Sequence, residues 1–139
     1  MNFMKIEIKD FEELKELHTA YKLAIGEDTP TDADFKRLYK AIENEEILFY
    51  GCRCKEKLVA CCSISTTFST FNYQKSGVFE DFYIRPEFRH QGIARKLVAF
   101  AYEQSGAGSL TVGCADCDVE MYRAIGFAIP LGNMLAFEN

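Results

Sequence analysis

The hydrophobic positions of the first 26 residues switch from the two-residue period of a strand to the spacing of a helix. Residues 3–8 alternate in polarity, which predicts a half-buried strand. Asp10 is suited to cap a helix that Gly26 ends. Its apolar stripe recurs every three or four residues: Phe11, Leu14, Leu17, His18, Tyr21 and Ile25. We interpret His18 in this stripe as a packing residue.

A second helix is predicted after the segment 29–32. There Thr29 is suited to be the cap, Pro30 the first helical residue and Asp32 the acid three residues after the cap. The apolar positions that follow have helical spacing: Phe35, Leu38, Tyr39 and Ile42. Two strands, 47–54 and 58–67, then form a hairpin around a tight turn at 55–57.

The second half of the chain alternates strands and helices. The predicted elements are a loop at 69–76, a strand at 77–85, a helix from Gly92 to Gly106, a strand at 109–114, a short helix near 118–125, and one or two closing strands within 127–137. This order predicts an α/β fold in which helices cover both faces of a mixed sheet.

Composition narrows the class of protein. The chain has 139 residues, 48% of them hydrophobic and 27% charged, so we expect one globular domain over 1–139. No apolar run approaches the roughly 20 residues of a membrane span, and the charged N-terminus is unlike a signal peptide, so a cytoplasmic protein without a membrane partner is expected. A net charge of −5 argues against nucleic-acid binding and suits a cationic partner better.

Six cysteines raise the question of disulfides or a metal. Without an export signal, reduced thiols are the better interpretation. Cys114 and Cys117 have a C-x-x-C spacing, and Cys52 and Cys54 are candidate further ligands for zinc. Only one C-x-x-C is present and it lies late in the chain, so a zinc or redox protein is the minor hypothesis, and we expect no metal.

The strongest chemical signal lies where a strand stops at Pro86 and the pattern Arg89-x-x-Gly92-x-Ala94 opens a helix. The start of a helix exposes unpaired amides at the positive end of its dipole, which suits a pyrophosphate. Small residues at 92 and 94 keep the backbone accessible, while Arg89, Arg95 and Lys96 add positive charge. An ordinary helix start with a glycine has the same spacing.

Three blocks in order resemble the Gcn5-related N-acetyltransferase (GNAT) family. They are the strand and loop 80–89, the loop Arg89-His90-Gln91-Gly92-Ile93-Ala94, and Tyr122-x-x-x-Gly126-Phe127. The resemblance implies a GNAT-like acyl-CoA N-acyltransferase fold, with a central mixed sheet of six to seven strands and about four helices on both faces. It also implies acetyl-CoA as co-substrate, and a homodimer is an expectation because many relatives are dimers.

The resemblance also implies where the cofactor binds. Main-chain amides of Gln91, Gly92, Ile93, Ala94 and Arg95 would hold the pyrophosphate, in a loop that includes Arg89 and His90. The main chain of Phe82, Tyr83 and Ile84 would hold the pantetheine arm. One departure is that Ala115 stands where many members have Asn, and Asp118 where they have a small residue, so an expected contact to CoA is missing. Asp116 and Asp118 are candidates to replace that contact or to cap the short helix.

The implied activity is transfer of an acetyl group to a primary amine of a small molecule or peptide, by direct attack in a ternary complex. Glu80 is the candidate base, and strand alternation puts it on the face of Phe82 and Ile84, with Asp81 on the other. By resemblance Tyr122 is the acid that protonates the thiolate, and an amide of Phe82 or Tyr83 the oxyanion donor. The structural alternatives are a solvated or paired Glu80 and a packing Tyr122.

The acceptor is less constrained. Acids between the first two helices are suited to attract an amine or to start a helix: Glu27, Asp28, Asp32 and Asp34. The alternative function is a non-catalytic CoA-binding module of the same fold that acts through a partner protein.

Overall fold

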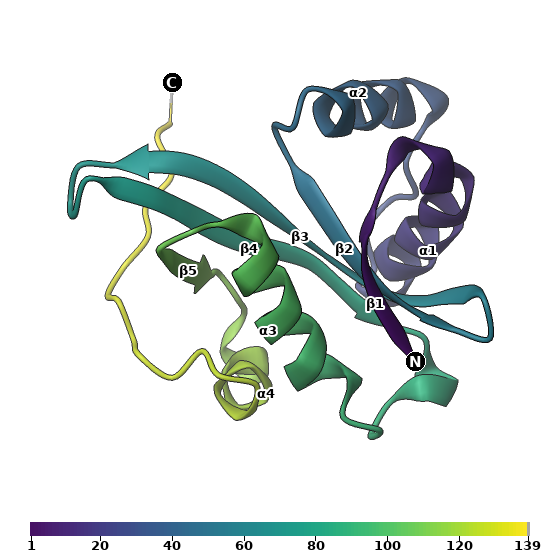
Figure 1. Ribbon diagram of the computed structural model, residues 1–139. Helices are drawn as coiled ribbons and strands as arrows, with labels where there is room; N and C mark the ends of the chain where they lie inside the picture. The colour runs from purple at the N-terminus through teal and green to yellow at the C-terminus, as the bar shows by residue number, and fades with distance from the viewer. Residues whose placement is uncertain (139) are drawn as a thin grey trace.

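A five-stranded mixed sheet forms the centre of the computed structural model, which describes residues 1–138 (Figure 1). Its strands lie in chain order: β1 (Asn2–Ile6), β2 (Leu48–Cys54), β3 (Lys57–Ser69), β4 (Gln74–Ile84) and β5 (Ser109–Val112). The first four pair antiparallel, and β5 pairs parallel with β4. The predicted mixed sheet is confirmed, with five strands in place of six to seven.

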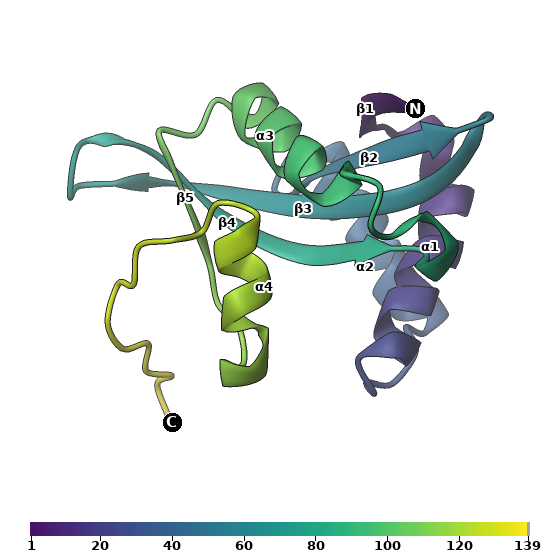
Figure 2. The same ribbon diagram turned by 90° about the horizontal axis from the view of Figure 1, so that it is seen from below.

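Helices cover both faces of the sheet, as predicted. In the edge-on view of Figure 2, α1 (Phe11–Ala24) and α2 (Asp32–Glu43) lie below the sheet and α3 (Ile93–Ser105) lies above it. The short α4 (Val119–Ala124) follows β5. Across residues 1–138, no helix combines the length and the apolar composition that a membrane crossing requires.

Two apolar clusters hold these layers together. Between the sheet and α1, Leu14 and Leu17 are fully buried against Phe49. On the α3 side, Leu97 packs into a cluster that includes Ile64 and Phe79. Each such side chain stabilises the fold by about 1.5–3 kcal/mol relative to exposure. The helical and strand periodicities of the sequence therefore correspond to the two faces of one sheet.

Some boundaries differ from the prediction. Thr31, not Thr29, caps α2. Its hydroxyl accepts a hydrogen bond from the Asp34 amide at 3.1 Å, and the Asp34 carboxylate accepts one from the Thr31 amide. Both Thr29 and Thr31 have an acid three residues later, so the pattern alone fits either cap. The predicted loop 69–76 is mostly the end of a long hairpin, in which Ser69 pairs with Gln74.

The closing strands predicted within 127–137 are not present. Residues 127–138 form no strand, and several of their apolar side chains are exposed. Alternation over so few residues does not supply the partner that a strand requires. β5 therefore lies at the edge of the described sheet.

Candidate functional site

A β-bulge in β4 interrupts its pairing with β3. Ser63 pairs with Glu80 and Cys61 pairs with Tyr83, so two residues of β4 stand opposite the single residue Cys62. Asp81 adopts a φ of 53°, in the left-handed region that non-glycine residues rarely enter. A bulge of this kind redirects the side chains on either side of it.

The bulge overturns the predicted face of Glu80. Residues directly opposite each other share a face, so Glu80 lies on the face of Ser63, whose hydroxyl donates to Asp81 Oδ2 at 2.6 Å. Phe82 instead packs on Phe79 in the α3-side cluster. Glu80 and Asp81 are thus both on the α1 face. Simple alternation predicts instead that they lie on opposite faces, with Glu80 on the same face as Phe82 and Ile84. The extra residue of the bulge is the physical reason.

β4 and β5 separate just before the bulge. Their parallel pairing covers only Ser76–Phe79 against Ser109–Val112, and from Glu80 to Ile84 the described part of β4 pairs with β3 alone. Figure 2 shows the two strands diverging beside α3 and α4. Main-chain groups of this stretch that point toward β5 are therefore open to a ligand. This stretch includes the predicted pantetheine residues Phe82, Tyr83 and Ile84.

The start of α3 adjoins the same opening. Gly92 is the cap residue with a φ of 84°, and it lacks a side chain that would bond the first amides. A Cβ built at Gly92 would meet nothing within 4 Å, so the space beside the cap residue is open. Ile93 is buried and anchors the helix start to the core, while the preceding His90 and Gln91 are exposed. The arrangement fits a bound anion such as a pyrophosphate.

The arginines of the motif have structural contacts of their own. Arg89 Nε donates to the Ile84 carbonyl at 2.9 Å, and its guanidinium lies 5.6 Å from the ring centre of Tyr83. Arg95 donates to the carbonyl of Ala124 at the end of α4. These contacts tie the loop to β4 and α3 to α4. Ala94, one residue earlier, is only partly buried.

Tyr122 of α4 reaches the opening from the α3 side. Its ring packs 6.4 Å from Phe82 and 5.9 Å from Phe127, between ring centres. Burial, with smaller effects from Asp118 and Cys114, raises the pKa of Tyr122, so the phenol stays protonated at neutral pH and is suited to donate a proton.

α1 places a polar row opposite the bulge that the sequence interpretation did not recognise as functional. His18, Tyr21 and Lys22 are spaced three and four residues apart, on one side of the helix. Tyr21 lies 6.3 Å from Tyr83 between ring centres. Burial, aided by the charge of Asp81, raises the pKa of Tyr21 to about 12. The helical spacing of these polar residues within an apolar stripe was the available signal.

His18 is buried against Phe49, in keeping with its predicted packing, but it also carries an unsatisfied atom. Its Nδ1 is buried without a hydrogen-bond partner. Burial lowers the pKa of His18, and the negative charge of Asp81 opposes that effect. The imidazole is therefore favoured in its neutral form, which has one nitrogen able to accept a hydrogen bond.

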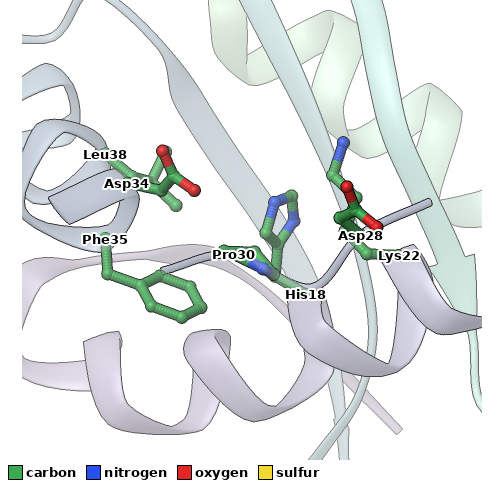
Figure 3. A pocket seen from close by; sticks show the side chains of 7 residues that line it. All are labelled: His18, Lys22, Asp28, Pro30, Asp34, Phe35 and Leu38. Carbon is green, nitrogen blue, oxygen red and sulfur yellow. The ribbon is translucent and has the colours of Figure 1, made fainter. Parts of the chain in front are cut away.

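A cavity of about 290 Å³ opens beside His18 (Figure 3). Its walls come from α1, the loop after it, and α2, and its lining consists of His18, Lys22, Asp28, Pro30, Asp34, Phe35 and Leu38. Two of the acids predicted to lie near an acceptor, Asp28 and Asp34, are thus brought to one cavity. Glu27 and Asp32 do not line it.

The cysteines form neither a disulfide nor a metal-binding group within residues 1–138. Cys114 and Cys117 are exposed, Cys52 is buried in the α3-side core, and all six thiols are free. Among residues 1–138, no group of three or more His, Cys, Asp or Glu side chains is arranged to hold a metal ion.

Comparison with known proteins places these features in a wider context. The model of the GNAT acetyltransferase family matches residues 11–128. A probable acetyltransferase of known structure superposes with a TM-score of 0.85 at 20% identity, over 100% of this chain and 99% of that chain. No curated protein sequence matches this chain.

Two further structures were solved with ligands. An aminoglycoside acetyltransferase from an uncultured soil metagenomic sample, in complex with sisomicin, has a TM-score of 0.83 at 12% identity, covering 99% of this chain and 95% of that one. A predicted acetyltransferase from Clostridium acetobutylicum with acetyl-CoA has a TM-score of 0.76 at 18% identity, with coverage of 99% and 95%. At these identities the likeness concerns the fold.

Proposed function

Since the chain belongs to the GNAT family of acetyltransferases, whose co-substrate is acetyl-CoA, we propose that it transfers an acetyl group to a primary amine of a small molecule or peptide. The amine attacks the thioester directly in a ternary complex. The observation that carries this proposal is the separation of β4 from β5 beside the open amides of α3.

In this proposal the cofactor spans the two open backbone sites. The pyrophosphate binds the amides of residues 91–95, in front of the cap residue Gly92, where the space is free. The pantetheine arm runs along the main chain of residues 82–84. It takes the position of a neighbouring strand there, because β5 pairs with β4 only up to Phe79. The thioester then lies next to the bulge, where the amide of Phe82 or Tyr83 is the oxyanion donor.

The two proposed catalytic side chains approach the thioester from opposite faces of β4. Glu80 lies on the α1 face and takes the proton of the attacking amine, directly or through a water molecule. Tyr122 lies on the α3 face and gives a proton to the departing thiolate. The Tyr122 ring lies 6.4 Å from that of Phe82 and the Tyr21 ring lies 6.3 Å from that of Tyr83, so both tyrosines border the stretch of β4 that follows Glu80, which supports this arrangement. The amine therefore enters from the α1 side, and CoA leaves toward α4.

Calorimetry with acetyl-CoA and a thiol-release assay with a panel of amines test this function. Glu80→Gln and Tyr122→Phe are expected to lower kcat by about 10²-fold or more with little change in acetyl-CoA affinity. Glu103→Gln, at an exposed position of α3, and Tyr39→Phe, on α2, are the matched controls and should retain activity. Absence of acetyl-CoA binding would contradict the proposal.

The same experiments identify the alternative, a non-catalytic CoA-binding module that acts through a partner protein. In that case acetyl-CoA binds, none of the amines releases CoA thiol, and the two variants bind the cofactor as the wild type does.

A further inference from the structure

Two buried residues of β3 hold the bulge residue Asp81, one at its side chain and one at its main chain. The Ser63 hydroxyl donates to Asp81 Oδ2 at 2.6 Å, and the Cys61 thiol donates to the Asp81 carbonyl at 3.5 Å. These two residues flank Cys62, the residue of β3 that faces the bulge. The part of β4 with the left-handed backbone is therefore fixed from β3 at two points.

The contact from Ser63 is the stronger of the two. A length of 2.6 Å is typical of a hydroxyl that donates to a carboxylate, which is among the strong hydrogen bonds of proteins. A thiol is a weak donor, although burial raises the pKa of Cys61, so its proton is retained. Asp81 has a φ of 53°, which residues with a Cβ rarely adopt. The hydrogen bond from Ser63 therefore stabilises an otherwise unfavourable backbone.

The peptide group after Asp81 contains the amide of Phe82. No cis peptide bond occurs among residues 1–138, so the Asp81 carbonyl and the Phe82 N–H point in opposite directions. The carbonyl is turned to Cys61 of β3. The Phe82 N–H consequently points away from β3, on the side where β5 has separated from β4.

The amide of Tyr83 has the opposite direction. Successive residues of a strand turn their main-chain groups alternately toward and away from the partner strand. The Arg85 amide donates to a β3 carbonyl at 2.9 Å, whereas the Ile84 carbonyl accepts from Arg89 in the loop after β4. Tyr83 thus faces β3, as Arg85 does, and Phe82 faces the open side, as Ile84 does. Of the two candidate oxyanion donors, the Phe82 amide is the one that a thioester is able to reach.

We propose that Ser63 is a positioning residue for acetyl transfer: its hydrogen bond to Asp81 fixes the bulge and so directs the Phe82 amide at the thioester oxygen. This inference rests on the proposed function for the place of the thioester. A donor lowers the barrier most when it is already aimed at the oxygen on which negative charge develops. Ser63 itself touches neither the acceptor nor the cofactor and acts through one peptide group.

Infrared spectroscopy of bound acetyl-CoA, isotope-labelled at the thioester carbonyl, tests this role without an acceptor amine. A hydrogen bond to the carbonyl oxygen lowers its stretching frequency, so the band should move to lower frequency on binding to the wild type. Ser63→Ala should lose most of that shift, while calorimetry should find its acetyl-CoA affinity within about threefold of the wild type. Ser65→Ala is the matched control, because Ser65 of β3 pairs with Val78 outside the bulge. It should keep the shift.

Two substitutions of Asp81 separate the backbone from the carboxyl group, since both remove the carboxyl. Glycine adopts a positive φ without strain, so Asp81→Gly should form the bulge without help from Ser63 and retain the shift. Valine disfavours this conformation, so Asp81→Val should lose the shift as Ser63→Ala does. Adding Ser63→Ala to Asp81→Gly should have little further effect. Circular dichroism checks that each variant folds.

Turnover gives a second measurement. In the thiol-release assay, with the amine of the panel that reacts fastest, Ser63→Ala should lower kcat about tenfold or more, because a small displacement of an aligned group has an effect of this size. Ser65→Ala should retain kcat.

The outcomes that overturn the inference are specific. They are the absence of a carbonyl shift in the wild type, an equal shift in Ser63→Ala, and an equal loss of the shift in Asp81→Gly and Asp81→Val, which would assign the effect to the carboxyl group. A Ser63-dependent shift without thiol release from any amine contradicts the transferase activity and leaves the positioning of the amide in place. Thiol release with a carbonyl band that is independent of Ser63 contradicts the positioning role and leaves the transferase activity in place.

Discussion

At the scale of single residues, Arg53 of β2 has the most extensive ionic contacts. Its two terminal nitrogens donate to the two carboxylate oxygens of Glu13 at 3.0 and 2.8 Å, and Nη2 also reaches Asp10 at 3.0 Å. The Arg53 side chain is only 19% exposed. These contacts join the start of α1 to the sheet. They lie on the face of the sheet that α1 covers.

Arg53→Ala is therefore expected to destabilise the protein by about 1–3 kcal/mol, because it leaves two carboxylates without their partner. Urea denaturation measures this change in the free energy of unfolding. Arg37→Ala is the control: Arg37 pairs with Asp34 but is 73% exposed, so its loss should cost no more than about 1 kcal/mol. Equal costs for the two variants would contradict the argument.

The same cluster predicts a pH dependence. The hydrogen bond from Arg53 lowers the pKa of Glu13 below its ordinary value of 4.5. A carboxyl with a lowered folded pKa stabilises the fold above its ordinary pKa and loses that effect as pH falls through the folded pKa. The stability difference between wild type and Arg53→Ala should thus narrow below about pH 4.5. Denaturation series at pH 7 and pH 3.5 check it, and a constant difference would contradict it.

At the scale of elements, α3 has a glycine in the left-handed conformation at each end, and the surroundings of the two ends differ. Gly92 precedes the helix with a φ of 84°, and Gly106 ends it with a φ of 73°. A Cβ would meet no atom within 4 Å at either position. The N-terminal end follows β4 through the loop 85–92, whereas the C-terminal end leads into β5. A substitution at either glycine therefore has a backbone cost without a steric clash.

Gly92→Ala should destabilise the fold by about 1 kcal/mol through its positive φ. It should also weaken acetyl-CoA binding about tenfold or more, because the methyl group adds bulk to the open space beside the proposed pyrophosphate site. Gly106→Ala should have the same effect on stability and none on acetyl-CoA binding. Thermal unfolding and calorimetry measure the two effects. Equal loss of affinity in both variants would indicate a general effect of stability.

At the scale of the whole molecule, the proposed cofactor contacts belong to β4, α3 and α4, which only the folded chain brings together. Unfolded chains lack this arrangement, so acetyl-CoA should bind the native state alone. At an acetyl-CoA concentration 100 times the dissociation constant, binding is expected to raise the free energy of unfolding by about 2.7 kcal/mol. A thermal shift that rises with acetyl-CoA concentration and is weaker in Gly92→Ala checks this. The homodimer expected from the family resemblance stays a prediction, for which light scattering is the measurement.

Local sequence determined the elements and the start of α3. Helices and strands follow from the periodicity of apolar residues between near neighbours, as at Leu14 and Leu17. The pattern Arg89-x-x-Gly92-x-Ala94 placed the start of α3 correctly, because caps and glycine conformations depend on a few adjacent residues. The family blocks extended this to acetyl-CoA.

Only the tertiary structure decided the faces and the cavity. Glu80 lies on the α1 face, and not on the face predicted for it, because of the bulge in β4. That bulge arises from the pairing of β4 with Ser63 and Cys61, which are about 20 residues away in the chain. His18, Lys22 and Asp28 line one cavity because α1, its following loop and α2 enclose it. Periodicity describes a segment relative to itself, whereas hydrogen-bond register and enclosure depend on which distant segments it meets.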